Sequence, residues 1–116
     1  MNYKLVEFVL GQEGHTVSRA ANGFEAVDMA TNDPPDLIFM DLQMPGMDGL
    51  EATRRLRLHH RTVSVPIVAL TASAMAKDKR MVLEAGCDDY LTKPVSPADL
   101  VAMANRFLVR QDTPQS

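Results

Sequence analysis

The chain has 116 residues, the length of a single globular domain. Hydrophobic residues make up 46% of it and charged residues 23%, a composition that excludes an intrinsically disordered chain. The formal net charge of −3 and the lack of a basic run argue against direct binding of nucleic acid, and no apolar stretch approaches the roughly 20 residues of a membrane-spanning helix.

The first part of the chain alternates between helical and strand patterns. Apolar residues at three- and four-residue spacing indicate a first helix, which Gly14 is expected to end. The pair Asn22-Gly23 predicts a turn into a second helix that ends before Asp33. The expected elements are a helix over residues 2–14, a short β-branched strand over 16–20 (TVSRA), a helix over 24–32, and a strand buried on both faces over 36–41 (DLIFMD).

The second part of the chain continues the alternation. Asp48 with Glu51 forms an acidic analogue of a capping box, Gly86 supplies a helix stop, and Ser96 caps a last helix. The expected elements are helices from Gly49 to about Leu58, from Ser73 to Ala85 and from Ser96 onward, with strands over 65–71 (VPIVALT) and 89–94 (DYLTKP). We expect one domain over residues 1–110 and a disordered tail over 111–116.

This alternation predicts an α/β protein, with a parallel sheet and helices on both faces. In such sheets the chemistry gathers at the carboxyl ends of the strands. Asp41, Thr71 and Lys93 fall at the ends of three successive predicted strands. Any one of them alone reads as an ordinary polar residue at the end of a strand. Three together favour a shared site.

A carboxylate, a hydroxyl and an ammonium group in one crevice suit the handling of a phosphoryl group. The carboxylate of Asp41 can act as the nucleophile and form an acyl phosphate. The hydroxyl of Thr71 can donate to a phosphoryl oxygen, and Lys93 can offset its charge. The main-chain carbonyl of Gln43 could reach a hard cation such as Mg²⁺.

The segments LIFMDLQMPGMDGLE, VPIVALTASA and GCDDYLTKPV resemble the phosphoacceptor, threonine and lysine-proline motifs of bacterial two-component response-regulator receiver domains. The resemblance runs from the first helix to about Val109, and it is nearest to receivers of the single-domain or hybrid-kinase type. It implies a flavodoxin-like, doubly wound parallel sheet. The haloacid-dehalogenase phosphatases use similar motifs, but they need a second Asp as general acid where this chain has Gln43.

The resemblance also implies the roles of individual residues. Asp41 would accept phosphate from a histidine kinase or a histidine-phosphotransfer protein, and Thr71 and Lys93 would read the phosphoryl group. Tyr90 would be the aromatic switch residue, whose ring turns inward when Thr71 moves. The alternative is that Tyr90 is an ordinary half-buried aromatic residue of a strand. Pro94 would follow a cis peptide, and Mg²⁺ would be held by Asp41 and the backbone carbonyl of Gln43. The product would be a signal to a downstream protein target, not an enzymatic turnover.

Receivers also have a first strand that ends in two acidic residues, and this sequence shows neither. We therefore expect four strands and five helices, weak or lost Mg²⁺ binding, and a homodimer or strand exchange that covers the gap in the sheet. None of the acids elsewhere replaces the pair convincingly: Glu7, Glu13, Asp88 and Asp89.

Two interpretations of function stay open at this point. One is a phosphoacceptor receiver with impaired activity, and the other is a degenerate receiver that acts only as a protein-binding module, without phosphorylation. The single cysteine, Cys87, fits a reducing cytoplasm and is expected to be a buried filler. The three histidines show no metal-binding spacing and are expected at the surface: His15, His59 and His60.

Overall fold

The computed structural model describes residues 3–44, 46–73 and 75–112, with the side chains as far as residue 108. The chain folds as two compact units. One comprises the residues up to Ser18 together with those from Pro94 onward, and the other comprises Arg19–Lys93. The second unit holds the sheet and all three residues of the predicted crevice.

The sheet of the second unit is parallel and has the strand order β1-β2-β3. Its strands are β1 (Ile38–Asp41), β2 (Ile67–Thr71) and β3 (Asp89–Thr92). The register pairs Asp41 with Leu70 and Thr71 with Thr92, so the three strands end together at one edge. Every residue of β2 is buried, as expected for the central strand of a sheet.

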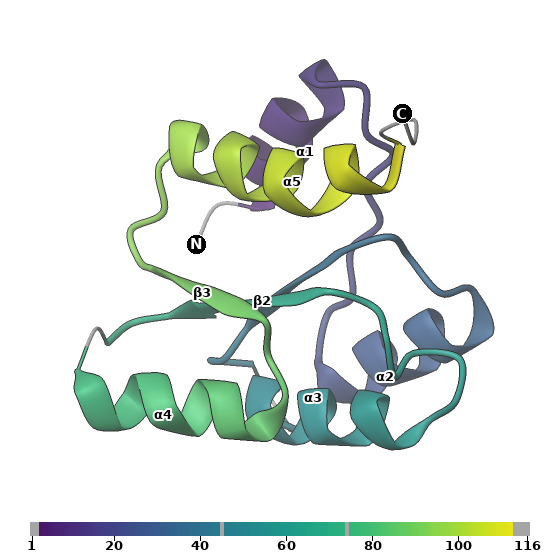
Figure 1. Ribbon diagram of the computed structural model, residues 1–116, viewed down its shortest axis with the longest axis vertical. Helices are drawn as coiled ribbons and strands as arrows, with labels where there is room; N and C mark the ends of the chain where they lie inside the picture. The colour runs from purple at the N-terminus through teal and green to yellow at the C-terminus, as the bar shows by residue number, and fades with distance from the viewer. Residues whose placement is uncertain (1–2, 45, 74, 113–116) are drawn as a thin grey trace. The chain divides into compact units, whose positions relative to one another are not determined.

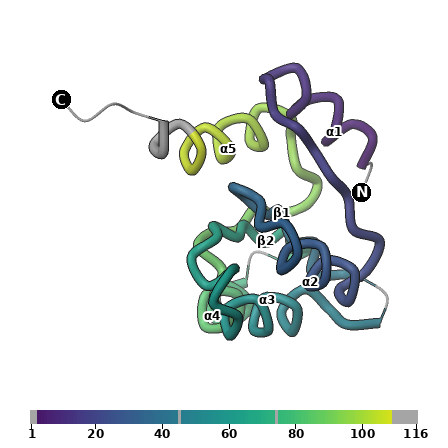
Figure 2. The backbone as a smooth tube through the Cα atoms, turned by 90° about the vertical axis from the view of Figure 1, so that its right-hand side faces the viewer, coloured from purple at the N-terminus to yellow at the C-terminus, as the bar shows by residue number. Residues whose placement is uncertain are grey.

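Three helices line one side of this sheet. They are α2 (Gly23–Asn32), α3 (Gly49–Leu58) and α4 (Ala76–Ala85), and they lie side by side in both views (Figure 1 and Figure 2). Their apolar faces meet the sheet in one buried cluster, which contains Ala30, Met40, Met47, Ala52, Leu56, Ile67, Ala69, Val82 and Cys87. Burial of this apolar surface is the main stabilising term for a unit of this size.

Side chains at the helix ends explain where these helices begin and stop. Asn22 accepts a hydrogen bond from the backbone N–H of Glu25 at 2.9 Å, and Asp48 accepts one from Glu51 at 2.9 Å. Each satisfies a backbone donor that the helix itself leaves unpaired. Gly86 ends α4 in the left-handed conformation, with φ +114°. These three predicted helix boundaries are confirmed.

Arg57 fastens the amino ends of β2 and β3. Its guanidinium donates to the backbone carbonyls of Gly86 at 2.8 Å and Val65 at 2.7 Å, and to Asp88 Oδ2 at 2.9 Å. The same carboxylate oxygen accepts the N–H of Ile67 at 2.8 Å. Asp88 is therefore held by Arg57 and Ile67 at the amino ends of the strands, whereas Asp41 lies at their carboxyl ends.

The first unit consists of α1 (Tyr3–Gln12) packed against α5 (Pro97–Asp112). Leu10 of α1 and Leu100 and Ala104 of α5 are buried. Ser96 Oγ accepts the N–H of Asp99 at 3.1 Å, which confirms the predicted cap. Helix α5 extends two residues into the predicted tail, and the rest of that tail lies outside the described residues.

The prediction of a strand over residues 16–20 is wrong. These residues have no regular secondary structure, so the described chain has five helices and three strands instead of four. A β-branched segment becomes a strand only when a neighbour completes its hydrogen bonds. No strand in the described part of the chain pairs with this segment.

Two predicted boundaries also shift. Helix α4 begins at Ala76, three residues after the predicted start, because Ser73 is engaged in a turn with Thr71. Strand β1 begins at Ile38, and its first two residues are only half-buried, not covered on both faces. No helix in the described ranges is long and apolar enough to cross a bilayer.

Cys87 lies in the buried cluster beneath α3. Its sulfur lies 3.7 Å from Thr53 Oγ1. Burial raises the pKa of the Cys87 thiol above its ordinary value, and the nearby Thr53 hydroxyl and Arg57 offset only part of that rise. The thiolate, which is the reactive form, is therefore disfavoured in the folded chain.

Alkylation of Cys87 by iodoacetamide should accordingly be at least about tenfold slower in the folded chain than in urea, because both burial and the raised pKa suppress the thiolate. The rate can be followed by mass spectrometry at pH 8. A Ser64→Cys variant in a Cys87→Ser background is the control, since Ser64 is exposed. Equal folded-state rates at the two positions would contradict the assignment of Cys87 to the core.

Candidate functional site

Asp41 is the last residue of β1 and is buried, with 6% of its surface exposed. Its Oδ1 atom accepts a hydrogen bond from Lys93 Nζ at 2.7 Å and another from the backbone N–H of Gln43 at 2.9 Å. A buried carboxylate is tolerated only when charged or hydrogen-bonding partners replace its lost water. Lys93 and the backbone N–H of Gln43 are these partners for Asp41.

Lys93 reaches Asp41 because of the strand order. It directly follows β3, and its backbone N–H donates to the carbonyl of Thr71 at 2.7 Å. This bond fixes the start of its side chain beside the end of β2. Because β2 lies between β3 and β1, the lysine extends across the end of the central strand to the carboxylate. The structure thus brings Asp41 and Lys93 into direct contact.

The chain turns back on itself after Asp41 and packs closely against the end of β1. A Cβ atom at Gly49 would lie 2.6 Å from the carbonyl oxygen of Asp41 and 2.9 Å from Leu42 Cα, so only glycine fits there. Gly46 has φ +73°, a conformation that side chains other than glycine rarely adopt. The glycines of this loop therefore hold the start of α3 against the site.

Thr71 ends the central strand and is buried. Its hydroxyl bonds with the backbone of Ser73, donating to the carbonyl at 3.3 Å and accepting the N–H at 3.2 Å. Thr71 therefore lies on the strand between Asp41 and Lys93, while its hydroxyl is engaged in its own turn.

Tyr90 and Pro94, the other two residues implied by the resemblance, lie in or after β3. Tyr90 is half-buried and packs against the core, with the ammonium of Lys79 5.3 Å from its ring centroid. This position fits either a switch residue or an ordinary strand aromatic. Pro94 directly follows Lys93, and the cis peptide between them stays a prediction.

Metal ligands are sparse around Asp41. Among the described residues, no group of three or more His, Cys, Asp or Glu side chains is placed to hold a metal ion. Mg²⁺ prefers six oxygen ligands, usually with one or two carboxylates among them. Asp41 Oδ1 already has an ammonium and an N–H as partners, so the described donors do not by themselves fit a tight Mg²⁺ site.

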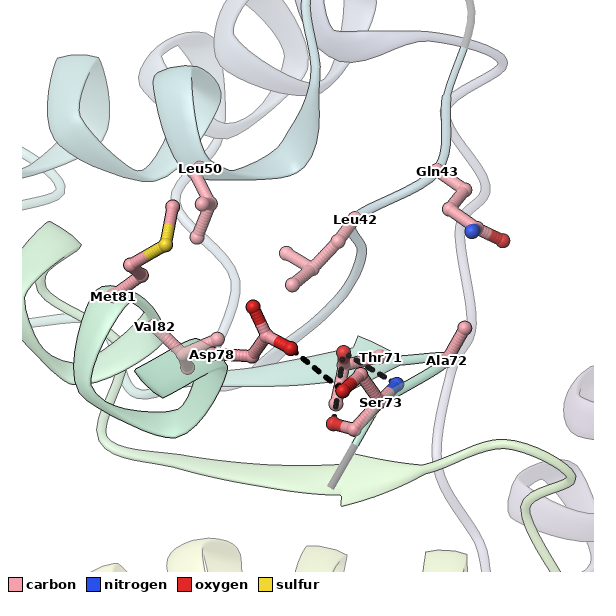
Figure 3. Close-up of a pocket in the computed structure, with 9 residues that line it drawn as sticks. All are labelled: Leu42, Gln43, Leu50, Thr71, Ala72, Ser73, Asp78, Met81 and Val82. Carbon is pink, nitrogen blue, oxygen red and sulfur yellow. Dashed lines mark hydrogen bonds between the residues drawn. The ribbon is translucent and has the colours of Figure 1, made fainter. Parts of the chain in front are cut away.

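Two residues near the site were missed by the sequence interpretation: Ser73 and Asp78. Ser73 Oγ donates to Asp78 Oδ2 at 2.6 Å, and both line a pocket of about 210 Å³ (Figure 3). Leu42 and Thr71 also line the pocket, whereas Asp41 and Lys93 do not. The sequence pattern predicted that the helix begins at Ser73. With the serine assigned to the helix, its bond to Asp78 could not be anticipated.

The profile of the response regulator receiver domain family matches residues 1–105. The chain belongs to this family. The family is a signalling module of two-component systems, and its members are not conventional enzymes.

A receiver region of this type occurs within larger sensor kinases. The chain is 46% identical over 109 residues to the sensor protein GacS of Pseudomonas syringae pv. syringae. That match covers 91% of this chain but only 12% of GacS, so the chain corresponds to a small part of that protein.

Solved receiver structures are also similar. One is the receiver domain of a sensor histidine kinase from Pseudomonas aeruginosa, with magnesium coordinated in the active site cleft; it has 39% identity and a TM-score of 0.84, over 91% of this chain and 87% of that one. Another is the receiver domain of Ssk1 from Saccharomyces cerevisiae, in complex with the histidine phosphotransfer protein Ypd1. It has 35% identity and a TM-score of 0.87, over 96% of this chain and 83% of that one.

Proposed function

We infer that this receiver domain accepts a phosphoryl group from a phosphohistidine onto Asp41 and signals through a conformational change. The observation that carries the proposal is the contact between the buried Asp41 carboxylate and Lys93 Nζ at 2.7 Å. This contact sets a cation beside a carboxylate at the end of a strand. That pairing suits a nucleophile on which negative charge accumulates during the reaction.

The transfer itself needs little from the protein beyond positioning and charge. A carboxylate oxygen of Asp41 attacks phosphorus, a P–O bond forms, and the P–N bond to the donor histidine breaks. The leaving nitrogen keeps the electron pair of the broken bond, and the imidazole departs as a neutral ring because its other nitrogen already carries a proton. Lys93 offsets the charge of the phosphoryl oxygens, which carry most of it in the transition state.

We propose that Thr71 and Tyr90 carry the signal away from Asp41. The Thr71 hydroxyl holds two long hydrogen bonds to Ser73, and it can exchange them for one to a phosphoryl oxygen. Tyr90, half-buried on the neighbouring strand, can then repack. A change at Asp41 thereby reaches β3 and α4 without a long chain of contacts.

We propose that this 116-residue chain binds Mg²⁺ weakly. The support is the ligand count of the described residues, in which Asp41 supplies one paired carboxylate and Gln43 one backbone carbonyl. A bound Mg²⁺ would neutralise charge on the phosphoryl group. With weak binding, that task falls more heavily on Lys93.

The donor is proposed to be a histidine kinase or a histidine-phosphotransfer protein, and the recipient of the signal a downstream protein. With such donors, the proposed location of the chain is the cytoplasm. The net charge of −3 gives no support to a nucleic-acid partner.

A phosphorylation-independent binding module is the second candidate. The observation that favours it is the sparse set of metal ligands around Asp41. In that case the carboxylate and Lys93 would serve only as a structural ion pair. A test of whether the chain becomes phosphorylated distinguishes the two functions.

Incubation with acetyl phosphate or a phosphohistidine donor should add the mass of one phosphoryl group at Asp41, and Asp41→Asn should abolish it. Asp48→Asn is the matched control, because Asp48 is exposed at the start of α3 and asparagine caps a helix equally well. Undiminished labelling of Asp41→Asn would refute the phosphoacceptor assignment. If the wild-type chain gains no phosphoryl group from either donor, the result would favour the binding module.

Magnesium affinity should be at least about tenfold lower in this chain than in a version extended upstream by a strand that ends in two acids, because the added strand would supply two further carboxylate ligands. Titration followed through the amide resonance of Gln43 measures both forms. Equal affinities would show that another residue of the chain completes the metal site.

We also propose that the chain self-associates. No strand of the described residues pairs with the outer edge of β1, and exposed sheet edges readily recruit another strand. Sedimentation velocity and thermal unfolding over a concentration series should show a larger species and a higher Tm as concentration rises. A monomer at every concentration, melting at one temperature, would contradict the association.

A further inference from the structure

The turn between β2 and α4 is held by a short chain of hydrogen bonds. The Thr71 hydroxyl bonds to the backbone carbonyl and N–H of Ser73 at 3.3 and 3.2 Å. Ser73 Oγ in turn accepts the N–H of Met75 at 3.2 Å and donates to Asp78 Oδ2 at 2.6 Å. The chain therefore runs from the end of the central strand into the first turn of α4 (Figure 3).

The last of these bonds is the strongest. A hydroxyl that donates to a carboxylate at 2.6 Å makes a charge-assisted bond, whereas the bonds at 3.2–3.3 Å lie at the long end of the usual range. Asp78 lies in the first turn of α4, where the helix dipole favours a negative charge. The carboxylate is thus well placed to hold the serine in one position.

This bond adjoins the start of helix α4. Its N-cap residue is Met75, which makes no side-chain capping bond. Instead, the Ser73 hydroxyl accepts a hydrogen bond from the N–H of Met75. The same hydroxyl donates one to the carboxylate of Asp78, which lies inside the helix. The arrangement resembles a capping box displaced by two residues toward Thr71.

Packing alone does not fix the turn. Thr71, Ser73 and Asp78 border the pocket of about 210 Å³, whose opposite walls are apolar. In Figure 3, Leu50 and Met81 form that apolar side, and the hydrogen-bonded groups lie across from it. Space beside the turn leaves the hydrogen bonds to decide where the Thr71 hydroxyl lies.

We propose that Asp78 is a positioning residue that, through Ser73, latches the Thr71 hydroxyl into its own turn in the unphosphorylated chain. The Ser73–Asp78 latch opposes the turning of Thr71 toward Asp41, and it sets how readily a phosphoryl group recruits that hydroxyl. A ligand can shift such an equilibrium only by its differential affinity for the two arrangements. The latch itself exists without phosphate, while its role in signalling rests on the proposed function.

Amide hydrogen exchange of the unlabelled 116-residue chain tests the latch. Asp78→Ala should raise the exchange rates of the Ser73 and Met75 amides about fivefold, the effect of losing one net hydrogen bond. Asp78→Asn, which keeps an acceptor oxygen, should stay within about twofold of wild type. Ser73→Ala should raise the exchange of Met75 in the same way, from the other side of the bond.

Lys77→Ala is the matched control, because Lys77 lies in the same turn and is exposed. It should leave both amides unchanged. Unchanged rates in Asp78→Ala, or an equal rise at the amides of residues 82–85 at the far end of α4, would overturn the proposal, since the carboxylate would then only stabilise the helix.

A second arm tests the link to signalling, with phosphoramidate as the phosphoryl donor. Labelling at Asp41 should speed exchange at Ser73 in the wild-type chain, and by a smaller factor in Asp78→Ala, where the latch is already open. Labelling without any change at Ser73 would overturn the link. Absence of labelling would instead refute the proposed function, and the exchange data from the unlabelled chain would still decide whether the latch exists.

Discussion

A buried carboxylate needs charged or hydrogen-bonding partners, and the strand order of the sheet brings Lys93 to Asp41. The parallel register ends three strands at one edge, and the residue after β3 then extends across the end of β2. Lys93 meets the carboxylate at 2.7 Å. Much of the site depends on this pair, because it gives the buried carboxylate a charged partner. The glycine at residue 49 completes the arrangement by letting the following loop fold back against Asp41.

The two edges of the sheet are built for different tasks. At the amino ends of β2 and β3, Arg57 and Asp88 share several backbone partners, which ties the strands to α3. At the carboxyl ends, Lys93 bonds to the Asp41 carboxylate and to the Thr71 carbonyl, each at 2.7 Å. The Thr71 hydroxyl makes two longer bonds to Ser73, at 3.3 and 3.2 Å. At these ends, the short bonds therefore hold Asp41 and Lys93, and the long ones hold the Thr71 hydroxyl.

The start of α4 links the two residues proposed as switches. Asp78 contacts the turn of Thr71 through Ser73, and the adjacent Lys79 lies over the ring of Tyr90. Neighbouring residues of one helical turn therefore reach Tyr90 directly and Thr71 through Ser73. A small movement of this turn would loosen both contacts together, which offers a physical route from the phosphoacceptor to the surface of α4. No transmission through the buried cluster is needed.

Periodicity, caps and turn residues act locally, so the sequence by itself determined most of the helices and strands and the three polar residues at the strand ends. The family followed from the resemblance of three motifs around those residues. The sequence placed the start of α3 at Gly49 correctly from Asp48 and Glu51 alone. It was wrong about the strand at residues 16–20, since pairing depends on a neighbour that local pattern does not reveal. Only the tertiary structure decided which side chains are in contact. The Asp41–Lys93 ion pair joins residues 52 positions apart in the sequence. Ser73 bonds to Asp78 because the serine precedes α4 and its hydroxyl faces the first turn of that helix. Such contacts follow from strand order and side-chain direction, which the sequence does not display.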